Sequence, residues 1–251
     1  MVHRYKPGAP RKRSVGAVAR FQHTPEMHGC RNGAKLLPME TRKLFWVFDV
    51  ISPFAYLGLK QLSRLPEGVS VEFVPVLFAG LLNHYGQTGP AEIAPKRRFT
   101  YRFALWRARQ MGVAMRLPPA HPFNPLPALR LIIAAGSNRR AVERVFDAVF
   151  VEGRDVSDAG VITDLAADLS IGDPQVALSA PDVKQRLHEN TNWAIERGVF
   201  GVPTLIVSNE VFWGHDAFEM ALDFLRDPAE FQNPEMQAIE SLPVGAVRRK
   251  S

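Results

Sequence analysis

The chain has 251 residues, of which 46% are hydrophobic and 22% charged, as in an ordinary globular protein that needs no disulfide or metal to hold a core. Its net charge of +6 arises in residues 1–38, which hold eight basic residues and a single acid, so the remainder gives no evidence of a specific nucleic-acid-binding domain. A single cysteine, Cys30, excludes an internal disulfide and paired zinc motifs, and no apolar run reaches the ~18 residues of a membrane span.

Residues 1–40 combine Pro, Gly and basic residues without an apolar period, which predicts a disordered basic arm. A solvated tail is the favoured interpretation, although non-specific contact with nucleic acid or anionic lipid is an alternative. The arm has no hydrophobic signal region, so we expect a cytoplasmic protein. Met39, just before the first predicted strand, is an alternative start.

A β-α-β unit follows the arm. The apolar run 44–48 is short enough for a buried strand, and 69–74 alternates as a second strand. Between them, Ser52-Pro53 is a helix start, with Ser at the N-cap and Pro at the first helical position. A β-α-β unit favours a parallel strand pair with a right-handed crossover.

Helical periods then occur around 95–112, 125–136, 139–152, 158–169 and 181–197, without a good strand between 79 and 198. Strands return at 204–207 and 211–213 as a predicted hairpin, followed by a helix over roughly 217–226.

This order predicts an α/β protein with a thioredoxin-like fold and a large inserted all-helical domain. The predicted domains are a thioredoxin-like part at 43–78 and 199–227, an insertion at 79–198, and a flexible tail at 228–251.

The site of a thioredoxin-like sheet lies where the first strand meets its helix, because the helix N-terminus stabilises an anionic sulfur there. A dithiol enzyme needs Cys-x-x-Cys at this position, but this chain has Ser52-Pro-Phe-Ala55, which excludes dithiol exchange. Pro203 opens the predicted third strand, where such a proline is commonly cis. It would leave the backbone of Val202 free to bond an extended ligand.

Three motifs, Asp49–Gly58, Gly198–Thr204 and Phe212–Asp216, occur in order, with His121–Pro125 between the first two. Together they resemble the 2-hydroxychromene-2-carboxylate isomerases, relatives of kappa-class glutathione transferases and of DsbA-type oxidoreductases. The resemblance covers about residues 43–226. The chain departs from the family pattern at His215, where Gln or Asn is usual, and at Ala217, where Arg is usual.

The resemblance implies glutathione as cofactor, a small aromatic substrate from a degradation pathway, and a possible homodimer. It implies that Ser52 faces the glutathione sulfur and that Asp216 faces the γ-glutamyl ammonium. The cofactor-binding residues that it implies are Ser52, Val202, Pro203, Trp213, Gly214, His215 and Asp216. Weaker candidates for substrate contact are Gln87, Lys96, His121 and Asn124. Asn124 is better explained as a helix cap, and Lys96 is equally explained as part of a solvated charged face.

Four functions compete. The first is a cis–trans isomerase in which Ser52 stabilises a glutathione thiolate that adds reversibly to the substrate. The second is a kappa-like transferase, which would consume glutathione. The third is a non-catalytic thioredoxin-like binding module. A serine hydrolase is disfavoured, because no Gly-x-Ser-x-Gly elbow surrounds Ser52.

Overall fold

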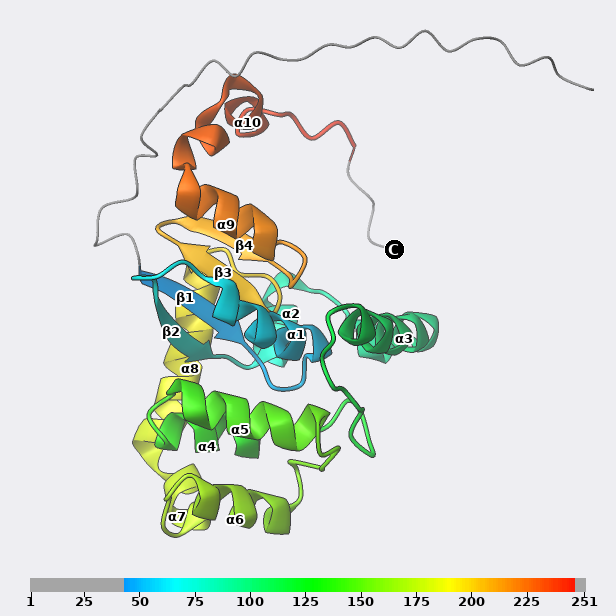
Figure 1. The fold of residues 1–251 in the computed structure, drawn as a ribbon, viewed down its shortest axis with the longest axis vertical. Helices are drawn as coiled ribbons and strands as arrows, with labels where there is room; N and C mark the ends of the chain where they lie inside the picture. The colour runs from blue at the N-terminus through cyan, green and yellow to red at the C-terminus, as the bar shows by residue number, and fades with distance from the viewer. Residues whose placement is uncertain (1–42, 247–251) are drawn as a thin grey trace, which may run out of the picture. The chain divides into compact units, whose positions relative to one another are not determined.

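The computed structural model describes residues 43–246, so the predictions for the 1–40 arm, Cys30 and Met39 lie outside the described residues. A four-stranded sheet in the order β2-β1-β3-β4 lies at its centre (Figure 1). The strands are β1 (Lys43–Phe48), β2 (Ser70–Pro75), β3 (Thr204–Val207) and β4 (Glu210–Trp213). β1 pairs parallel with β2 and antiparallel with β3, and β3 forms a hairpin with β4. The predicted β-α-β unit and hairpin are therefore confirmed.

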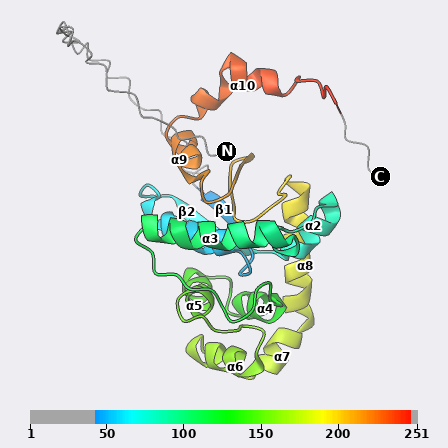
Figure 2. The same ribbon diagram turned by 90° about the vertical axis from the view of Figure 1, so that its right-hand side faces the viewer.

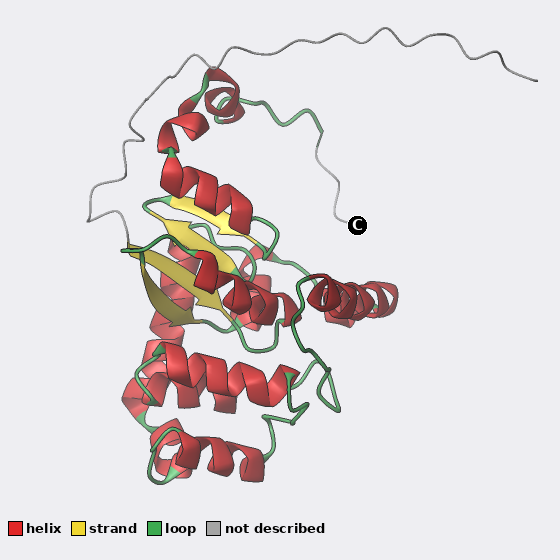
Figure 3. Ribbon diagram, viewed as in Figure 1, coloured by secondary structure: helices red, strands yellow, loops and turns green. Residues whose placement is uncertain are grey.

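Two helices of the thioredoxin-like part share a hydrophobic core with the sheet (Figure 3). Helix α1 (Pro53–Gln61) starts as predicted, with the Ser52 side chain accepting a hydrogen bond from the Ala55 N–H, and it ends in a 3-10 turn, η2 (Leu62–Arg64). Helix α9 (Phe218–Arg226) buries the side chains of Phe218, Phe224 and Leu225.

The chain between β2 and β3 is helical, as predicted. Its elements are α2 (Phe78–Tyr85), η3 (Pro90–Glu92), α3 (Ala94–Gln110), α4 (Leu126–Ala134), α5 (Arg139–Phe150), α6 (Ala159–Asp168), α7 (Pro174–Ser179) and α8 (Pro181–Glu196). Sequence periodicity found five of these and missed α2 and α7. Helix α7 has six residues, too few to show a helical period. Helix α2 has Leu77 as its N-cap, which cannot form a side-chain cap hydrogen bond.

The inserted helices and the sheet share one core. Trp46 and Phe48 of β1 pack against Phe146 of α5, with ring centroids 6.0 and 5.7 Å apart. Tyr56 of α1 stacks on Phe150 of α5 with centroids 5.4 Å apart, and its hydroxyl donates to the Ala114 carbonyl at 2.7 Å. In Figure 2, as in Figure 1, α4 to α7 lie beyond the β2 edge of the sheet and α9 lies near the β4 edge. The insertion therefore fixes the position of α1, which carries the candidate site at its N-terminus.

The segment after α9 differs from the flexible tail that the sequence predicts. Residues Pro228–Gln232 form a 3-10 turn, η4, and Pro234–Ile239 form helix α10. Asp227 and Asn233 cap these two elements through their side chains. Phe231 packs between the rings of Phe212 and Phe224, with centroids 6.2 and 5.3 Å apart. A single partly buried aromatic residue sets no helical period, which explains why periodicity gave no signal here.

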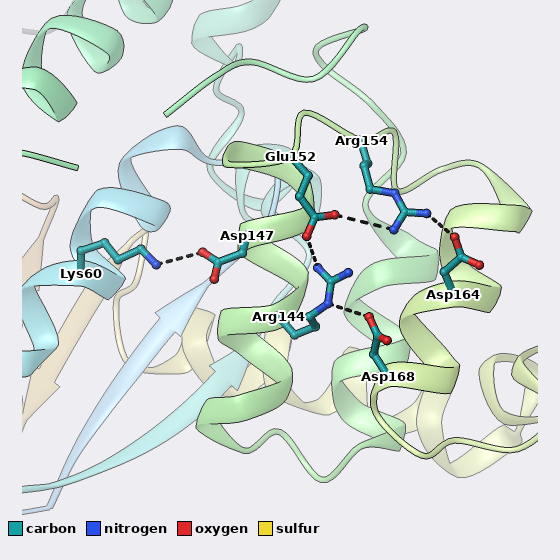
Figure 4. A network of polar contacts seen from close by, with 7 residues as sticks. All are labelled: Lys60, Arg144, Asp147, Glu152, Arg154, Asp164 and Asp168. Atoms are coloured by element: carbon teal, nitrogen blue, oxygen red, sulfur yellow. Dashed lines mark hydrogen bonds and ion pairs between the residues drawn. The ribbon is translucent and has the colours of Figure 1, made fainter. Parts of the chain in front are cut away.

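Ion pairs connect α5 to α6 on the surface (Figure 4). Arg144 binds Glu152 and Asp168, each at 2.8 Å, and Arg154 binds Asp164. Their side chains are between 25% and 63% exposed, so each pair contributes little to stability. Among residues 43–246, no helix is both long and apolar enough to cross a membrane.

Candidate functional site

The turn between β1 and α1 is held from inside by a buried carboxyl group. The Asp49 side chain is fully buried and accepts hydrogen bonds from the N–H groups of Ile51 at 3.0 Å and Phe78 at 2.9 Å. Burial raises the pKa of Asp49 to about 7, although the backbone hydrogen bonds oppose this. The turn therefore contains a carboxyl group that changes charge near neutral pH.

Ser52 follows this turn at the N-terminus of α1. Its hydroxyl accepts from the Ala55 N–H at 3.2 Å and lies 3.3 Å from the Val202 carbonyl oxygen, to which it donates. Since a hydroxyl has one hydrogen, Ser52 can exchange this long bond for a shorter one to an anionic ligand atom. The unpaired N–H groups and dipole of the first turn of α1 favour negative charge at the same place.

Val202 and Pro203 form the opposite side of the site. The bond between them is cis, as predicted. The Pro203 carbonyl accepts from the Gly214 N–H at 2.8 Å, which joins the start of β3 to the end of β4. Within residues 43–246, the Val202 N–H forms no hydrogen bond. It is therefore free to donate to a ligand.

A pocket of about 240 Å³ opens beside these residues. It is lined by Phe54, Phe103, Val202, Pro203, Trp213, Gly214, His215 and Asp216. Ser52 does not line the pocket itself but reaches it through its hydrogen bond to Val202. Six of the seven residues that the family resemblance implies for glutathione thus lie in the lining, and the seventh contacts it.

Two glycines allow the close packing of this pocket. A Cβ atom at Gly201 would overlap the indole of Trp213, and one at Gly214 would overlap the carboxylate of Asp216. Gly214 also has φ = +96°, a conformation that other residues adopt only with strain. Trp213 is 54% exposed and packs edge-on to Phe200, so its indole forms an accessible side of the pocket.

His215 is the most unusual lining residue. Its ring is stacked on Phe54 with centroids 5.1 Å apart and planes 6° from parallel. Burial lowers the pKa of His215, the Asp216 carboxylate opposes this, and the positive charge of Arg107 on α3 lowers it further. Its Nε2 atom is buried without a hydrogen-bond partner among the described residues. A buried polar atom without a partner requires an explanation, and the position of His215 in the pocket lining makes ligand contact a candidate.

The four weaker candidates lie elsewhere. Gln87 and Lys96 are exposed and do not line the pocket. The Asn124 side chain accepts from the Leu126 N–H at 3.1 Å, one residue before the N-cap of α4, which is Pro125 and not Asn124 as the sequence predicts. Both ring nitrogens of His121 are engaged within the protein, by Ile51 and Tyr101, so no ring nitrogen is left for substrate.

Sequence reasoning missed Phe54, Phe103 and Arg107. Phe54 lies in the Ser-Pro-Phe-Ala segment, whose aromatic residue could have been noticed beside the N-cap. Phe103 and Arg107 are four residues apart on α3 and therefore share one helix face. Nothing in the local sequence shows that this face meets the end of β4.

A larger hollow of about 1110 Å³ lies along the outer edge of β2, between the sheet and helices α4, α7 and α8. It is open and lies away from the N-terminus of α1. The smaller pocket is the better candidate, because the free Val202 N–H, the unpartnered His215 nitrogen and the helix N-terminus meet there.

Comparison with known proteins agrees with this architecture. The model of the DSBA-like thioredoxin domain family matches residues 44–226. Glutathione S-transferase kappa 2 of Caenorhabditis elegans is 25% identical over 219 residues, which cover 78% of this chain and 96% of that protein. The 2-hydroxychromene-2-carboxylate isomerase of Pseudomonas putida is 30% identical over 182 residues, 69% of this chain and 89% of that protein.

The same isomerase fold is found among solved structures. A structure of 2-hydroxychromene-2-carboxylate isomerase superimposes with a TM-score of 0.65 at 25% identity, covering 77% of this chain and 98% of that one. The relatives of the chain are thus enzymes of two kinds, isomerases and glutathione transferases, built on one fold.

Proposed function

Because the chain belongs to the DSBA-like thioredoxin domain family, with isomerases and kappa-class glutathione transferases among its relatives, we propose that it is a glutathione-dependent cis–trans isomerase. Its substrate is an aromatic-degradation intermediate similar to 2-hydroxychromene-2-carboxylate. The observation that carries the proposal is a serine hydroxyl, not a thiol, at the N-terminus of α1, facing the Val202 carbonyl.

The residues of the pocket fit glutathione by chemistry. Glutathione is a peptide, and the free Val202 N–H suits an extended peptide backbone. Its γ-glutamyl end carries an ammonium and a carboxylate, which suit the carboxylate of Asp216 and the positive charge of Arg107. The unpartnered Nε2 of His215 can accept or donate one hydrogen bond to the same end, according to its tautomer.

Ser52 would act as an activator and not as the attacking group. When bound, glutathione supplies the sulfur nucleophile that makes the substrate double bond transiently rotatable. Ser52 donates its hydroxyl hydrogen toward that sulfur, and the first turn of α1 adds partial positive charge. Both favour the charged form and so lower the pKa of the bound thiol.

The exposed rings beside the pocket suit a planar aromatic substrate. The Phe103 ring contacts Phe54 at a tilt, with centroids 5.9 Å apart. Phe99 and Trp106 stack on Phe103 along α3, with Phe99 67% and Trp106 51% exposed. Offset stacking on such rings is favourable for an aromatic ligand. The α3 helix also carries six basic and no acidic residues, which suits a carboxylate on the substrate.

A kappa-like transferase is the second candidate, because the kappa 2 relative is matched over almost its whole length. The experiment that decides is calorimetric titration with reduced glutathione, followed by incubation with a chromene carboxylate and glutathione. An isomerase converts the substrate while total glutathione stays constant, whereas a transferase consumes one glutathione per product. Absence of binding at millimolar glutathione would contradict both enzymes and favour a non-catalytic binding module.

A further inference from the structure

His121 lies next to the catalytic turn but outside the pocket, and both nitrogens of its ring are held. Its Nε2 is 2.6 Å from the carbonyl oxygen of Ile51, the residue before Ser52. Its Nδ1 is 2.5 Å from the Tyr101 hydroxyl, which also lies 3.1 Å from the His121 carbonyl. One side chain thus links α3 of the insertion to the turn that carries Ser52.

The partners define the hydrogen positions of the ring. A backbone carbonyl can only accept, so Nε2 must carry the hydrogen that it donates to Ile51. In a neutral imidazole the other nitrogen then accepts, and Tyr101 is the donor. Burial lowers the pKa of His121, which favours the neutral ring, although the bond to Ile51 opposes this. The Tyr101 hydroxyl therefore selects the tautomer that can hold Ile51.

The bond to Ile51 fixes more than one atom. The Ile51 carbonyl and the Ser52 N–H belong to the same planar peptide unit. The Ser52 N–H donates to the Asp49 carbonyl at 3.1 Å, so this unit is held at both ends, by His121 and by Asp49. A peptide unit held at both ends cannot rotate, and its orientation sets the direction of the Ser52 Cα–Cβ bond.

We propose that His121 and Tyr101 are positioning residues for Ser52, which aim its hydroxyl at the glutathione sulfur through the Ile51–Ser52 peptide. This inference rests on the proposed glutathione function. Neither residue lines the pocket, so we expect the pair to act on the stabilisation of the thiolate and not on the affinity for glutathione.

A purely structural role makes a different prediction. The His121 ring also packs edge-on against Tyr101 and Phe123, with centroids 5.0 and 5.5 Å apart. If packing alone matters, a phenylalanine at either position preserves the site. If hydrogen bonding positions Ser52, loss of the Tyr101 hydroxyl changes the chemistry of the bound thiol while leaving the packing intact.

The test measures the pKa of the bound glutathione thiol from its ultraviolet thiolate absorbance across pH, together with the glutathione Kd and kcat. Tyr101→Phe, His121→Phe and His121→Gln are compared with wild type and Ser52→Ala. Tyr56→Phe is the matched control, because it also removes a tyrosine hydroxyl that links α1 to the insertion, without contact to Ile51.

Tyr101→Phe and His121→Phe are expected to raise the pKa of the bound thiol in the direction of Ser52→Ala. They should lower kcat roughly tenfold, within the hundredfold that small misplacements of reacting groups can cost, with Kd nearly unchanged. His121→Gln, which keeps a donor for Ile51, should recover part of kcat, and Tyr56→Phe should match wild type.

Two results would overturn the inference, and they differ. If wild type forms the bound thiolate and Ser52→Ala loses it, but Tyr101→Phe matches wild type in thiol pKa and kcat, His121 and Tyr101 have only a packing role. If wild type itself forms no bound thiolate, the proposed function fails and the positioning role fails with it. Should His121→Phe not fold, Tyr101→Phe, which removes one oxygen atom from a partly exposed residue, still decides.

Discussion

Polar groups around the start of α1 are buried, whereas those in the ion-pair network between α5 and α6 are exposed to solvent. Asp49 is fully buried, and Ser52 and His215 are at most 8% exposed. The Asp164 side chain in the network is 63% exposed, and its partner Arg154 is 27% exposed. The network pairs its charges on an exposed surface, whereas the turn holds a carboxyl group away from water. Next to the start of α1, the Nε2 atom of His215, whose ring stacks on Phe54, has no hydrogen-bond partner among residues 43–246.

The difference indicates where the protein accepts a cost in stability. Burying a carboxylate or an unpaired imidazole nitrogen destabilises the folded state, and such costs persist where a ligand or a reaction uses the group. Exposed ion pairs change the free energy of unfolding little in either direction. We therefore expect substitutions in the turn to change activity more than stability, and substitutions in the network to change neither strongly.

The largest effect is expected for Ser52→Ala. Loss of the hydroxyl should lower kcat by about 10²–10³, as does loss of one donor to a developing anion in other enzymes. The measurement is steady-state isomerisation at saturating glutathione. Because Ser52 also caps α1, Asn138→Ala is the control: it removes the side-chain cap of α5 far from the pocket. Loss of cap energy alone, about 1 kcal/mol, should leave the activity of Asn138→Ala intact. Equal activity losses in both variants would contradict the role of Ser52.

Asp216→Asn should have the next largest effect, on glutathione affinity. Removing the charge that pairs with an ammonium costs about 1.5–3 kcal/mol, or about ten- to a hundredfold in Kd. Calorimetric titration with reduced glutathione measures it. Asp223→Asn on the exposed face of α9, where Asp223 pairs with Arg226, is the matched control and should bind as wild type does. Unchanged Kd in Asp216→Asn would remove Asp216 from the site.

Asp49→Asn tests the burial of the carboxyl group through the pH dependence of stability. The pKa of Asp49 is about 7 in the folded protein and 3.8 when unperturbed, so between these values the folded state holds the proton and the unfolded state does not. Wild type should therefore lose stability as pH rises through this window, by about 1.4 kcal/mol per pH unit relative to Asp49→Asn.

Urea unfolding of wild type and Asp49→Asn at pH 5, 6 and 7, values chosen inside about 3.8 to 7, provides the comparison. The difference between their free energies of unfolding should change steadily with pH. A difference that stays constant across the window would mean that Asp49 is ionised at the lower end and that its burial is compensated.

The smallest effect is expected for Arg144→Met in the network. It breaks the pairs with Glu152 and Asp168 but keeps an apolar stem of similar length, so we expect a loss below about 1 kcal/mol. Activity should be unchanged. High salt should reduce the stability of wild type toward that of the variant, because it screens exposed pairs. A large loss of activity in Arg144→Met would end the contrast between the two regions.

The sequence alone predicted the parts of this site that depend on residues close together in the chain. Ser52-Pro53 predicts the cap and start of α1, and Pro203 at the start of β3 predicts a cis bond after Val202. Both signals lie within a few residues of the feature that they predict. The order of the strands and helices along the chain was likewise predicted from the short apolar runs and the helical periods. These predictions needed no knowledge of distant contacts.

Distant contacts are what the sequence could not supply. The contact of the Phe103 ring with Phe54 and the bond from His121 to Ile51 join residues that lie 49 and 70 positions apart in the sequence. The sequence suggests His121 as a substrate residue, but its ring binds the Ile51 carbonyl. No local sequence pattern identifies that carbonyl as its partner. The order after residue 228 was missed for the same reason, since it depends on Phe231 reaching Phe212 and Phe224.

The pairing of β1 with β3 has a consequence for synthesis of the protein. β1 leaves the ribosome early, but its antiparallel partner is made only after the entire insertion. Closing such a long loop to complete a sheet is slow, because the entropy of loop closure is lost before the strand contacts form. Chains fold from the N-terminus as they emerge. We therefore expect the pocket, which needs residues 202–216, to be assembled late, so nascent chains arrested in the insertion carry Ser52 but bind no glutathione.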